Sequence, residues 1–243
     1  MKKTALVNAL AASALFMAAS ASATILTVFD GIPAGSASFN TTVTNAGGTV
    51  VTDTWTGLSS GSSLVRTDYT VTMNNAGSFF PTTYGTMSGQ VIDISPDGSF
   101  PGQNGTIASG ITFQFNTAVN SFGFEVGDWA TCCFNPTTDL FISFNDGTPI
   151  LVASAANYNQ GLFPNNAGAL VTEIFVAAFD DSSTFTKIQF WGNGSGEYLV
   201  AGGQVKYALL QQGSLPGVPE PASLALLGIG LAGLAAMRRR KTV

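Results

Sequence analysis

Short segments in which apolar and polar residues alternate are the feature that most constrains how this chain can fold. In the segment ITFQF, the apolar Ile111, Phe113 and Phe115 alternate with a threonine and a glutamine. Successive side chains of a strand point to opposite faces, so this pattern predicts a strand with one buried and one wet face. Further segments read as strands are residues 24–30, 36–44, 64–73, 91–94, 121–126, 140–144, 185–191 and 204–209.

Turn-forming residues separate these segments, and one of the turns defines a hairpin. In FISFNDGTPILV, residues 141–152, two apolar runs flank an Asn-Asp-Gly turn, so Asp146 is expected to form the turn rather than to act in catalysis. Many short strands with turns between them and an aromatic-rich inner face favour an all-β fold. We predict an antiparallel β-sandwich of the jelly-roll type, with a closed barrel as the alternative.

The N-terminus has the three parts of a secretory signal peptide. Two lysines precede an apolar core at residues 5–19, and Ala21 and Ala23 form a small-residue cleavage site. The mature chain is therefore expected to begin at Thr24, after a signal peptide at residues 1–23.

Charge and composition exclude several classes of function. Between residues 24 and 215, three basic residues against thirteen acidic ones leave a net charge of −10, so nucleic acid is not an expected partner. Histidine is absent, which removes the usual general base, the histidine-dependent triads and the commonest zinc ligand. Because charged residues are few, the surface is expected to consist mostly of Ser, Thr, Asn, Gln and Gly.

The two cysteines of the chain, Cys132 and Cys133, are adjacent. Export permits a disulfide, but neighbouring Cα atoms lie about 3.8 Å apart, less than the usual disulfide span of about 4.4–6.8 Å. Three arrangements stay open: a vicinal disulfide in a strained turn, two intermolecular bridges, or two free thiols. Trp129 and Phe134 beside them are expected to fill the end of the core, the alternative being a rigid apolar platform for a sugar ring.

The acidic residues offer candidate sites but no diagnostic spacing. Asp180 and Asp181, next to two serines, are candidate ligands for a calcium ion, and no other cofactor is expected. A glycoside hydrolase would need a pair of carboxyl groups, for which Glu125, Glu173 and Glu197 are the candidates. Since no spacing distinguishes these residues from other acids, the chain is not expected to be an enzyme.

The C-terminus combines the triplet Pro219, Glu220 and Pro221 with an apolar run at residues 222–237 and a basic cluster. As a helix the apolar run would be about 24 Å long, against the roughly 20 residues that usually span a bilayer. The basic cluster would keep residues 238–243 on the cytoplasmic side and the preceding domain outside. It consists of Arg238, Arg239, Arg240 and Lys241.

This order of triplet, short apolar helix and basic cluster resembles the PEP-CTERM sorting signal. The resemblance implies that the chain is a substrate of an exosortase, a membrane transpeptidase of Gram-negative bacteria that make extracellular polysaccharide. In that family Pro219, Glu220 and Pro221 would be the recognition element. The protein would be exported across the inner membrane, tethered transiently by the apolar helix, and then found at the cell surface or outside the cell. A plain single-pass anchor is the alternative.

The ectodomain itself is expected to be a non-enzymatic surface or matrix protein, associated with exopolysaccharide or biofilm. A carbohydrate-binding module is the alternative, with its ligand over exposed aromatic rings, and a secreted glycoside hydrolase is a further alternative. The candidate rings are Trp55, Trp129, Tyr158 and Trp191. The predicted organisation is a signal peptide at 1–23, a β-sandwich at 24–213, a linker at 214–221, a transmembrane helix at 222–237 and a basic tail at 238–243.

Overall fold

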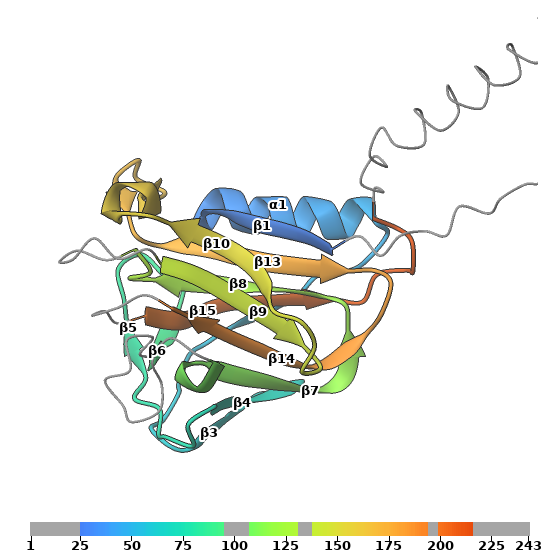
Figure 1. Ribbon diagram of the computed structural model, residues 1–243, viewed down its shortest axis with the longest axis horizontal. Helices are drawn as coiled ribbons and strands as arrows, with labels where there is room; N and C mark the ends of the chain where they lie inside the picture. Colours follow the sequence, from blue (N-terminus) through green and yellow to red (C-terminus); the bar gives the residue numbers. More distant parts are fainter. Residues whose placement is uncertain (1–24, 95–106, 131–137, 194–198, 216–243) are drawn as a thin grey trace, which may run out of the picture.

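The computed structural model describes residues 25–94, 107–130, 138–193 and 199–215, which form two packed antiparallel sheets with a helix outside one of them (Figure 1). Within these ranges no helix is both long and apolar enough to cross a membrane. The predicted signal peptide, sorting triplet, transmembrane helix and basic cluster lie outside the described residues.

The first sheet has seven strands in the order β1-β13-β8-β15-β6-β5, with β2 also paired to β15. Its strands are β1 (Ile25–Gly31), β2 (Val51–Thr54), β5 (Thr82–Thr83), β6 (Gln90–Ile94), β8 (Ser121–Gly127), β13 (Ile174–Asp180) and β15 (Leu199–Ala208). The last strand in the sequence, β15, therefore lies in the middle of this sheet, where it pairs with β8, β6 and β2.

The second sheet has six strands in the order β10-β9-β14-β7-β4-β3. Its strands are β3 (Ser63–Val65), β4 (Tyr69–Met73), β7 (Ile111–Val119), β9 (Thr138–Phe144), β10 (Ile150–Ala155) and β14 (Phe185–Gly192). The remaining elements are the small pair β11 (Phe163–Pro164) and β12 (Leu170–Val171), and the 3-10 helices η1 (Ile107–Ser109) and η2 (Tyr158–Gly161).

The connectivity of the eight strands β6, β7, β8, β9, β10, β13, β14 and β15 is that of a jelly roll. They form the orders β6-β15-β8-β13 in one sheet and β7-β14-β9-β10 in the other. The chain changes sheet at every step except between β9 and β10, which form a hairpin. The predicted antiparallel sandwich of jelly-roll type is thereby confirmed.

The core lies between the sheets and follows the predicted alternation. In β7, Ile111, Phe113 and Phe115 are buried, whereas Gln114 is exposed. Aromatic rings from both sheets meet there, with ring centroids 4.7 Å apart for Phe113 and Phe122. Such edge-to-face contacts add to the stability gained from burying the rings.

A partly buried polar network joins the two sheets. The indole N–H of Trp55, which follows β2, donates to the hydroxyl of Tyr69 in β4 at 2.8 Å. That hydroxyl donates in turn to Asp53 at 2.6 Å, and the Arg66 guanidinium donates to both oxygens of the same carboxylate. Burial alone would raise the pKa of Asp53, but the hydrogen bonds from Arg66 and Tyr69 outweigh it and hold the pKa below its ordinary value.

The strand expected at residues 36–44 is wrong, because this segment belongs to the helix α1 (Ile32–Asn45). The helix has a proline in its first turn, a position that proline tolerates well. Its buried residues Gly35, Phe39 and Val43 recur every four positions, which is a helical spacing. α1 packs on β1 and β13 (Figure 1), where Phe39 contacts Phe175 and Phe179.

One further strand prediction differs in detail, and the predicted hairpin is confirmed. The segment 64–73, expected as one strand, forms β3 and β4 with a turn between them. The hairpin of β9 and β10 is found as predicted: Asn145 and Asp146 have positive φ of 49° and 61°, and the N–H of Gly147 donates to the carbonyl of Phe144 at 2.8 Å. Positive φ at both central residues is the geometry that suits a tight hairpin turn.

Candidate functional site at the tail exit

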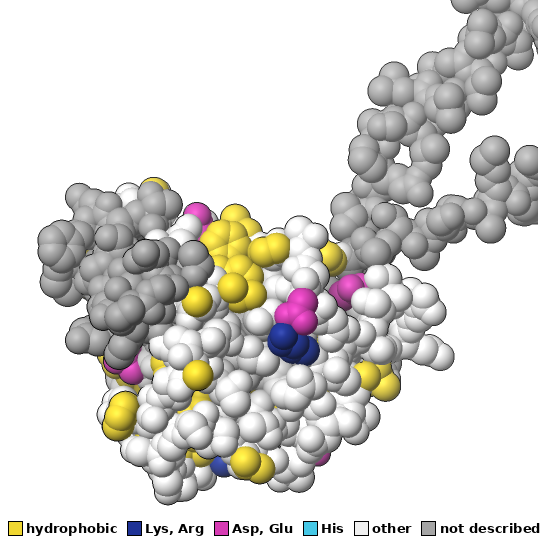
Figure 2. All heavy atoms as spheres, turned by 60° about the horizontal axis from the view of Figure 1, so that its bottom comes forward, with side chains coloured by type: hydrophobic (Ala, Val, Ile, Leu, Met, Phe, Trp, Pro, Cys, Tyr) yellow, Lys and Arg dark blue, Asp and Glu magenta, His cyan; other side chains and the backbone are white. Residues whose placement is uncertain are grey.

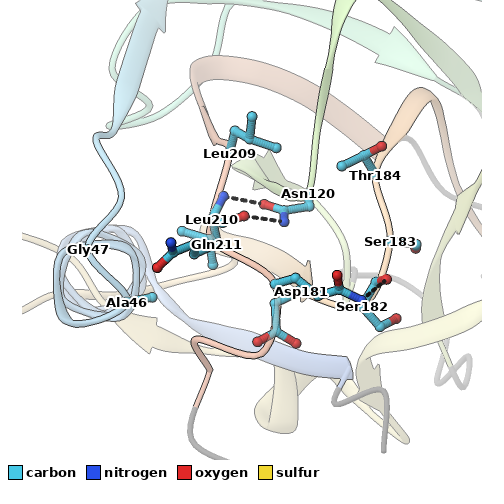
Figure 3. Close-up of a pocket in the computed structure, with 11 residues that line it drawn as sticks. Ala46, Gly47, Asn120, Asp181, Ser182, Ser183, Thr184, Leu209, Leu210 and Gln211 are labelled. Atoms are coloured by element: carbon cyan, nitrogen blue, oxygen red, sulfur yellow. Dashed lines mark hydrogen bonds between the residues drawn. The ribbon is translucent and has the colours of Figure 1, made fainter. Parts of the chain in front are cut away.

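The described chain ends beside an open groove of about 610 Å³, which we call the exit groove (Figure 3). Its walls come from the end of α1, the turn between β7 and β8, the turn after β13 and the segment that follows β15. The lining includes Gly47, Asn120, Asp181, Thr184, Leu209 and Gln212. Leu209 is 57% exposed, so the rim of the groove carries an accessible apolar side chain.

Asn120 holds the first part of the segment after β15. Its side-chain amide donates to the carbonyl of Leu210 at 3.0 Å and accepts from the N–H of the same residue at 2.6 Å (Figure 3). Its main-chain N–H donates to the carbonyl of Ala208. Asn120 is 2% exposed, so these bonds are shielded from water and fix the direction in which the chain leaves the sheet.

Asp181 holds the second part of this segment. Its carboxylate accepts a hydrogen bond from the N–H of Leu215 at 2.6 Å, and its carbonyl accepts one from Gly213 at 3.3 Å. The Leu215 side chain is 5% exposed and lies in an apolar cluster with Phe39 and Phe179. The folded part of the chain therefore continues to Leu215, two residues past the expected domain end at 213.

The carboxylates of the two candidate calcium ligands accept hydrogen bonds from other residues of the chain. Asp180 accepts hydrogen bonds from the N–H and hydroxyl of Ser182 and from the hydroxyl of Ser183, and Asp181 accepts from Leu215. Across the part of the chain that the structure describes, no three His, Cys, Asp or Glu side chains gather in a way that could hold a metal ion. Calcium binding at Asp180 and Asp181 stays a prediction.

Two of the three candidate glutamates lie buried on the outer side of the seven-stranded sheet, and Glu197 lies outside the described residues. Glu125 accepts from the N–H of Ser88 at 2.6 Å and from its hydroxyl at 2.5 Å. Glu173 accepts from the N–H of Thr86 at 2.9 Å and from its hydroxyl. Both carboxylates therefore hold the chain's own segment between β5 and β6, and these bonds occupy oxygens that a general acid or base would use.

The surroundings of Glu125 shift its protonation. Burial raises the pKa of the Glu125 carboxyl, hydrogen bonds from Ser88 lower it in part, and the charge of Glu173 raises it further. Burial also lowers the pKa of Lys206, partly offset by Glu125, while its ammonium group donates to Asn40 of α1 at 2.8 Å. Gly203, at φ +59° in the β15 bulge, is required here because a Cβ would overlap the Glu125 carboxylate.

Sequence reasoning missed the roles of Asn120, Ser88 and Thr86, because their partners are distant in the chain. One local signal was available for Glu125: the Gly-Gly pair at 202 and 203 lies inside a strand, and glycine at such a position is typical of a bulge or a close approach.

The three tryptophans lie inside the molecule. Trp55, Trp129 and Trp191 are 0%, 1% and 6% exposed, whereas Tyr158 is 38% exposed. The indole N–H of Trp129 donates to the carbonyl of Gly161 at 3.2 Å. The expected neighbours of Trp129, which are Cys132, Cys133 and Phe134, lie outside the described residues.

The outer face of the six-stranded sheet is built mostly from uncharged polar side chains. Five polar residues form a row across this sheet, in which each residue is the cross-strand partner of the next. The row runs through β9, β14, β7, β4 and β3. It consists of Ser143, Gln189, Thr112, Thr72 and Ser63. Of these, Ser143 and Gln189 are buried, whereas Thr72 and Ser63 are exposed. Beside this row Phe141 stacks on Trp191 with ring centroids 5.7 Å apart. Figure 2 likewise shows a surface with few charged side chains.

Comparisons with known proteins identify the tail rather than the sandwich. A family model described as the PEP-CTERM protein-sorting motif matches residues 217–241, so the chain carries this sorting motif at its C-terminal tail. No curated protein matches the chain.

Among solved structures, two variants of CBM29-2, a family 29 carbohydrate binding module, are similar to it at 12% and 13% identity. They cover 70% of this chain and 98% and 90% of their own, each with a TM-score of 0.34. A likeness of this size carries no conclusion about the ligand of this chain.

Proposed function

We propose that this protein is an exported surface or extracellular-matrix protein that an exosortase sorts through its C-terminal tail. The observation that carries the proposal is the PEP-CTERM motif at residues 217–241, which begins two residues after Leu215. Leu215 is buried and belongs to the folded sandwich. A folded domain followed directly by a sorting motif is the arrangement expected of cargo that is carried to the surface.

The proposed route has three steps. The signal peptide at residues 1–23 directs export across the inner membrane of a Gram-negative bacterium. The apolar run at 222–237 then holds the chain in the membrane, with the sandwich outside and the basic cluster inside. The exosortase finally recognises Pro219, Glu220 and Pro221 and processes the tail. The domain is then transferred to the surface or the extracellular layer.

For the ectodomain we propose a non-enzymatic role in an exopolysaccharide layer or biofilm. This proposal is supported by the hydrogen bonds that Ser88 donates to Glu125 and Thr86 donates to Glu173. These bonds occupy carboxylate oxygens that a general acid or base would use. The uncharged polar surface of the six-stranded sheet agrees with a hydrated, carbohydrate-rich surrounding.

Fractionation and intact mass of the mature protein test the sorting proposal. We expect the mature protein to lack the basic cluster at residues 238–243 in cells with the exosortase and to keep it in cells without the enzyme. A chain ending at Leu215 is the matched control, because it should be exported without tethering. Retention of the basic cluster and of the inner-membrane location in wild-type cells would show that the tail is a permanent anchor.

Carbohydrate binding is the second candidate. Phe141, on the outer face of the six-stranded sheet, is half-buried and stacks on the buried Trp191, so it is the ring of this pair that a sugar could reach. The test is binding of the purified protein to a panel of neutral and acidic polysaccharides. Phe141→Ala is compared with Phe80→Ala as the matched control, because Phe80 is an aromatic residue that is 70% exposed and does not belong to the stack. Loss of binding in Phe141→Ala but not in the control would support carbohydrate binding. If the wild type bound no polysaccharide, the matrix role would be favoured.

A further inference from the structure

The distance between the folded domain and the sorting triplet is short. Leu215 is fixed by Asp181 at 2.6 Å and by its own burial, and Pro219 follows four residues later. Four fully extended residues span at most about 14 Å. The apolar run begins seven residues after Leu215, which is at most about 25 Å.

These lengths leave little room for an enzyme that acts on the triplet. A single helix with its side chains is about 10–12 Å wide, so only one layer of protein fits between the triplet and the domain. Any protein that encloses Pro219, Glu220 and Pro221 must therefore meet the surface from which the chain departs. The exit groove opens beside this surface, because Asp181, which holds Leu215, lines the groove. The rim of the groove is formed by Gln211, Gln212 and, on the side away from Asp181, Leu209 (Figure 3).

We propose that the rim of the exit groove is a contact surface for the exosortase during processing of the tail. This rests on the proposed sorting function. Leu209 is 57% exposed, and the hollow beside it measures about 610 Å³ (Figure 3). A second hollow of about 410 Å³ shares Leu209 and Gly47 with the first. An exposed apolar side chain between two hollows offers a protein partner both an anchor and space for its own side chains.

The charge of this surface favours a protein over a lipid headgroup as the partner. Among the described residues that line the exit groove there is no lysine or arginine, and the one acidic residue, Asp181, is 5% exposed and bonded to Leu215. Anionic lipid surfaces attract clusters of basic residues. The rim instead presents Leu209, amides and hydroxyls, which suit an uncharged protein surface.

The experiment measures the rate of tail removal from the full-length chain in cells, by pulse labelling and gel shift. Leu209→Arg should slow removal about threefold to tenfold, because a charge would enter the contact. Val65→Arg is the matched control, since Val65 is 75% exposed on the edge strand β3 and lies outside the groove.

A second pair of chains, the wild type and Leu209→Arg, carries a spacer of six Gly and Ser residues inserted between Leu215 and Pro216. The spacer chain without the substitution is the spacer parent. This spacer adds up to about 20 Å, so the enzyme no longer has to meet the domain. Leu209→Arg should then be processed at the same rate as its spacer parent, which would exclude a general defect in export or processing as the cause of the slowing.

Each other outcome decides against the contact. An unchanged rate for Leu209→Arg in the native-length chain would overturn it, as would equal slowing with and without the spacer. Faster removal would indicate attraction to lipid instead. Tail removal that continues in cells without the exosortase would refute the proposed sorting function itself, whatever Leu209→Arg does.

Discussion

Asp181 accepts a hydrogen bond from the main-chain N–H of Leu215, at the end of the described chain and two residues before the sorting motif. The two residues are 34 positions apart in the sequence. Their contact joins the turn after β13 to the segment after β15, so the start of the tail has a defined place on the domain.

Replacing Asp181 by alanine should lower the free energy of unfolding by about 1–3 kcal/mol, because the buried N–H of Leu215 loses its acceptor. Urea denaturation of the purified protein measures the effect. Asp181→Asn is the matched control: its amide oxygen can still accept this bond, so the loss should be smaller. Equal stability of Asp181→Ala and the wild type would show that the contact contributes nothing.

Replacing Tyr69 by phenylalanine should also lower the free energy of unfolding by about 1–3 kcal/mol. The hydroxyl accepts from Trp55 and donates to Asp53, so its removal leaves a buried indole N–H without its partner. Thermal and urea unfolding should show the loss. Tyr158→Phe is the control, since Tyr158 is 38% exposed and should tolerate the change within about 0.5 kcal/mol.

Glu125 should give the stability a measurable dependence on pH. Burial raises its pKa above the ordinary value of 4.5, so the folded protein holds this proton more tightly than the unfolded chain does. The resulting stabilisation is complete below pH 4.5 and is lost as the pH rises through the folded pKa.

Glu125→Gln supplies the reference for this dependence. Glutamine can accept from the N–H of Ser88 and donate to its hydroxyl, but it does not titrate. The stability of the wild type relative to Glu125→Gln should therefore fall as the pH is raised from 4 toward neutrality in urea titrations. A difference independent of pH would contradict the shifted pKa.

Asp146→Gly should leave stability unchanged or raise it by up to about 1 kcal/mol. Asp146 lies at φ +61°, which glycine adopts without strain, and its ion pair with Lys187 is exposed and contributes little. Asp146→Val at the same site should be destabilising, because a β-branched residue is strained there. Calorimetry distinguishes the two variants, and a marked loss in Asp146→Gly would mean that the ion pair matters more than the turn.

The sequence was most informative where a strand has one wet face. β7 was predicted from its alternation, and the hairpin of β9 and β10 from its Asn-Asp-Gly turn. β13 was missed because both of its faces are covered, so its residues form an unbroken apolar run without alternation. The segment of α1 was predicted as a strand because its Ser, Thr and Ala residues gave no clear helical pattern. Of its large apolar residues, only Phe39 and Val43 have the helical spacing of four positions.

The contacts of Asn120 and Asp181 at the exit groove could not be predicted from the sequence, for a different reason. Asn120 and Asp181 are polar residues in turns, where such residues are common. Their partners Leu210 and Leu215 lie 90 and 34 positions away, and only the folded jelly roll brings them together. The sorting motif could be predicted because it is a local pattern of consecutive residues.

The central position of β15 bears on how the protein folds as it is exported. Translocation begins at the N-terminus, so β8 and β6 reach the outside before the strand that must lie between them. Until residue 208 has crossed, β1, β13 and β8 are separated from β6 and β5, and β2 has no partner strand, so unpaired edges that are prone to aggregate remain. On the proposed export route the apolar run at 222–237 follows soon afterwards in the sequence, so completion of the sheet and arrest in the membrane would be nearly simultaneous. Arrest of the chain in the membrane at this stage would give β15 time to pair with β8, β6 and β2 before the domain is released from the membrane.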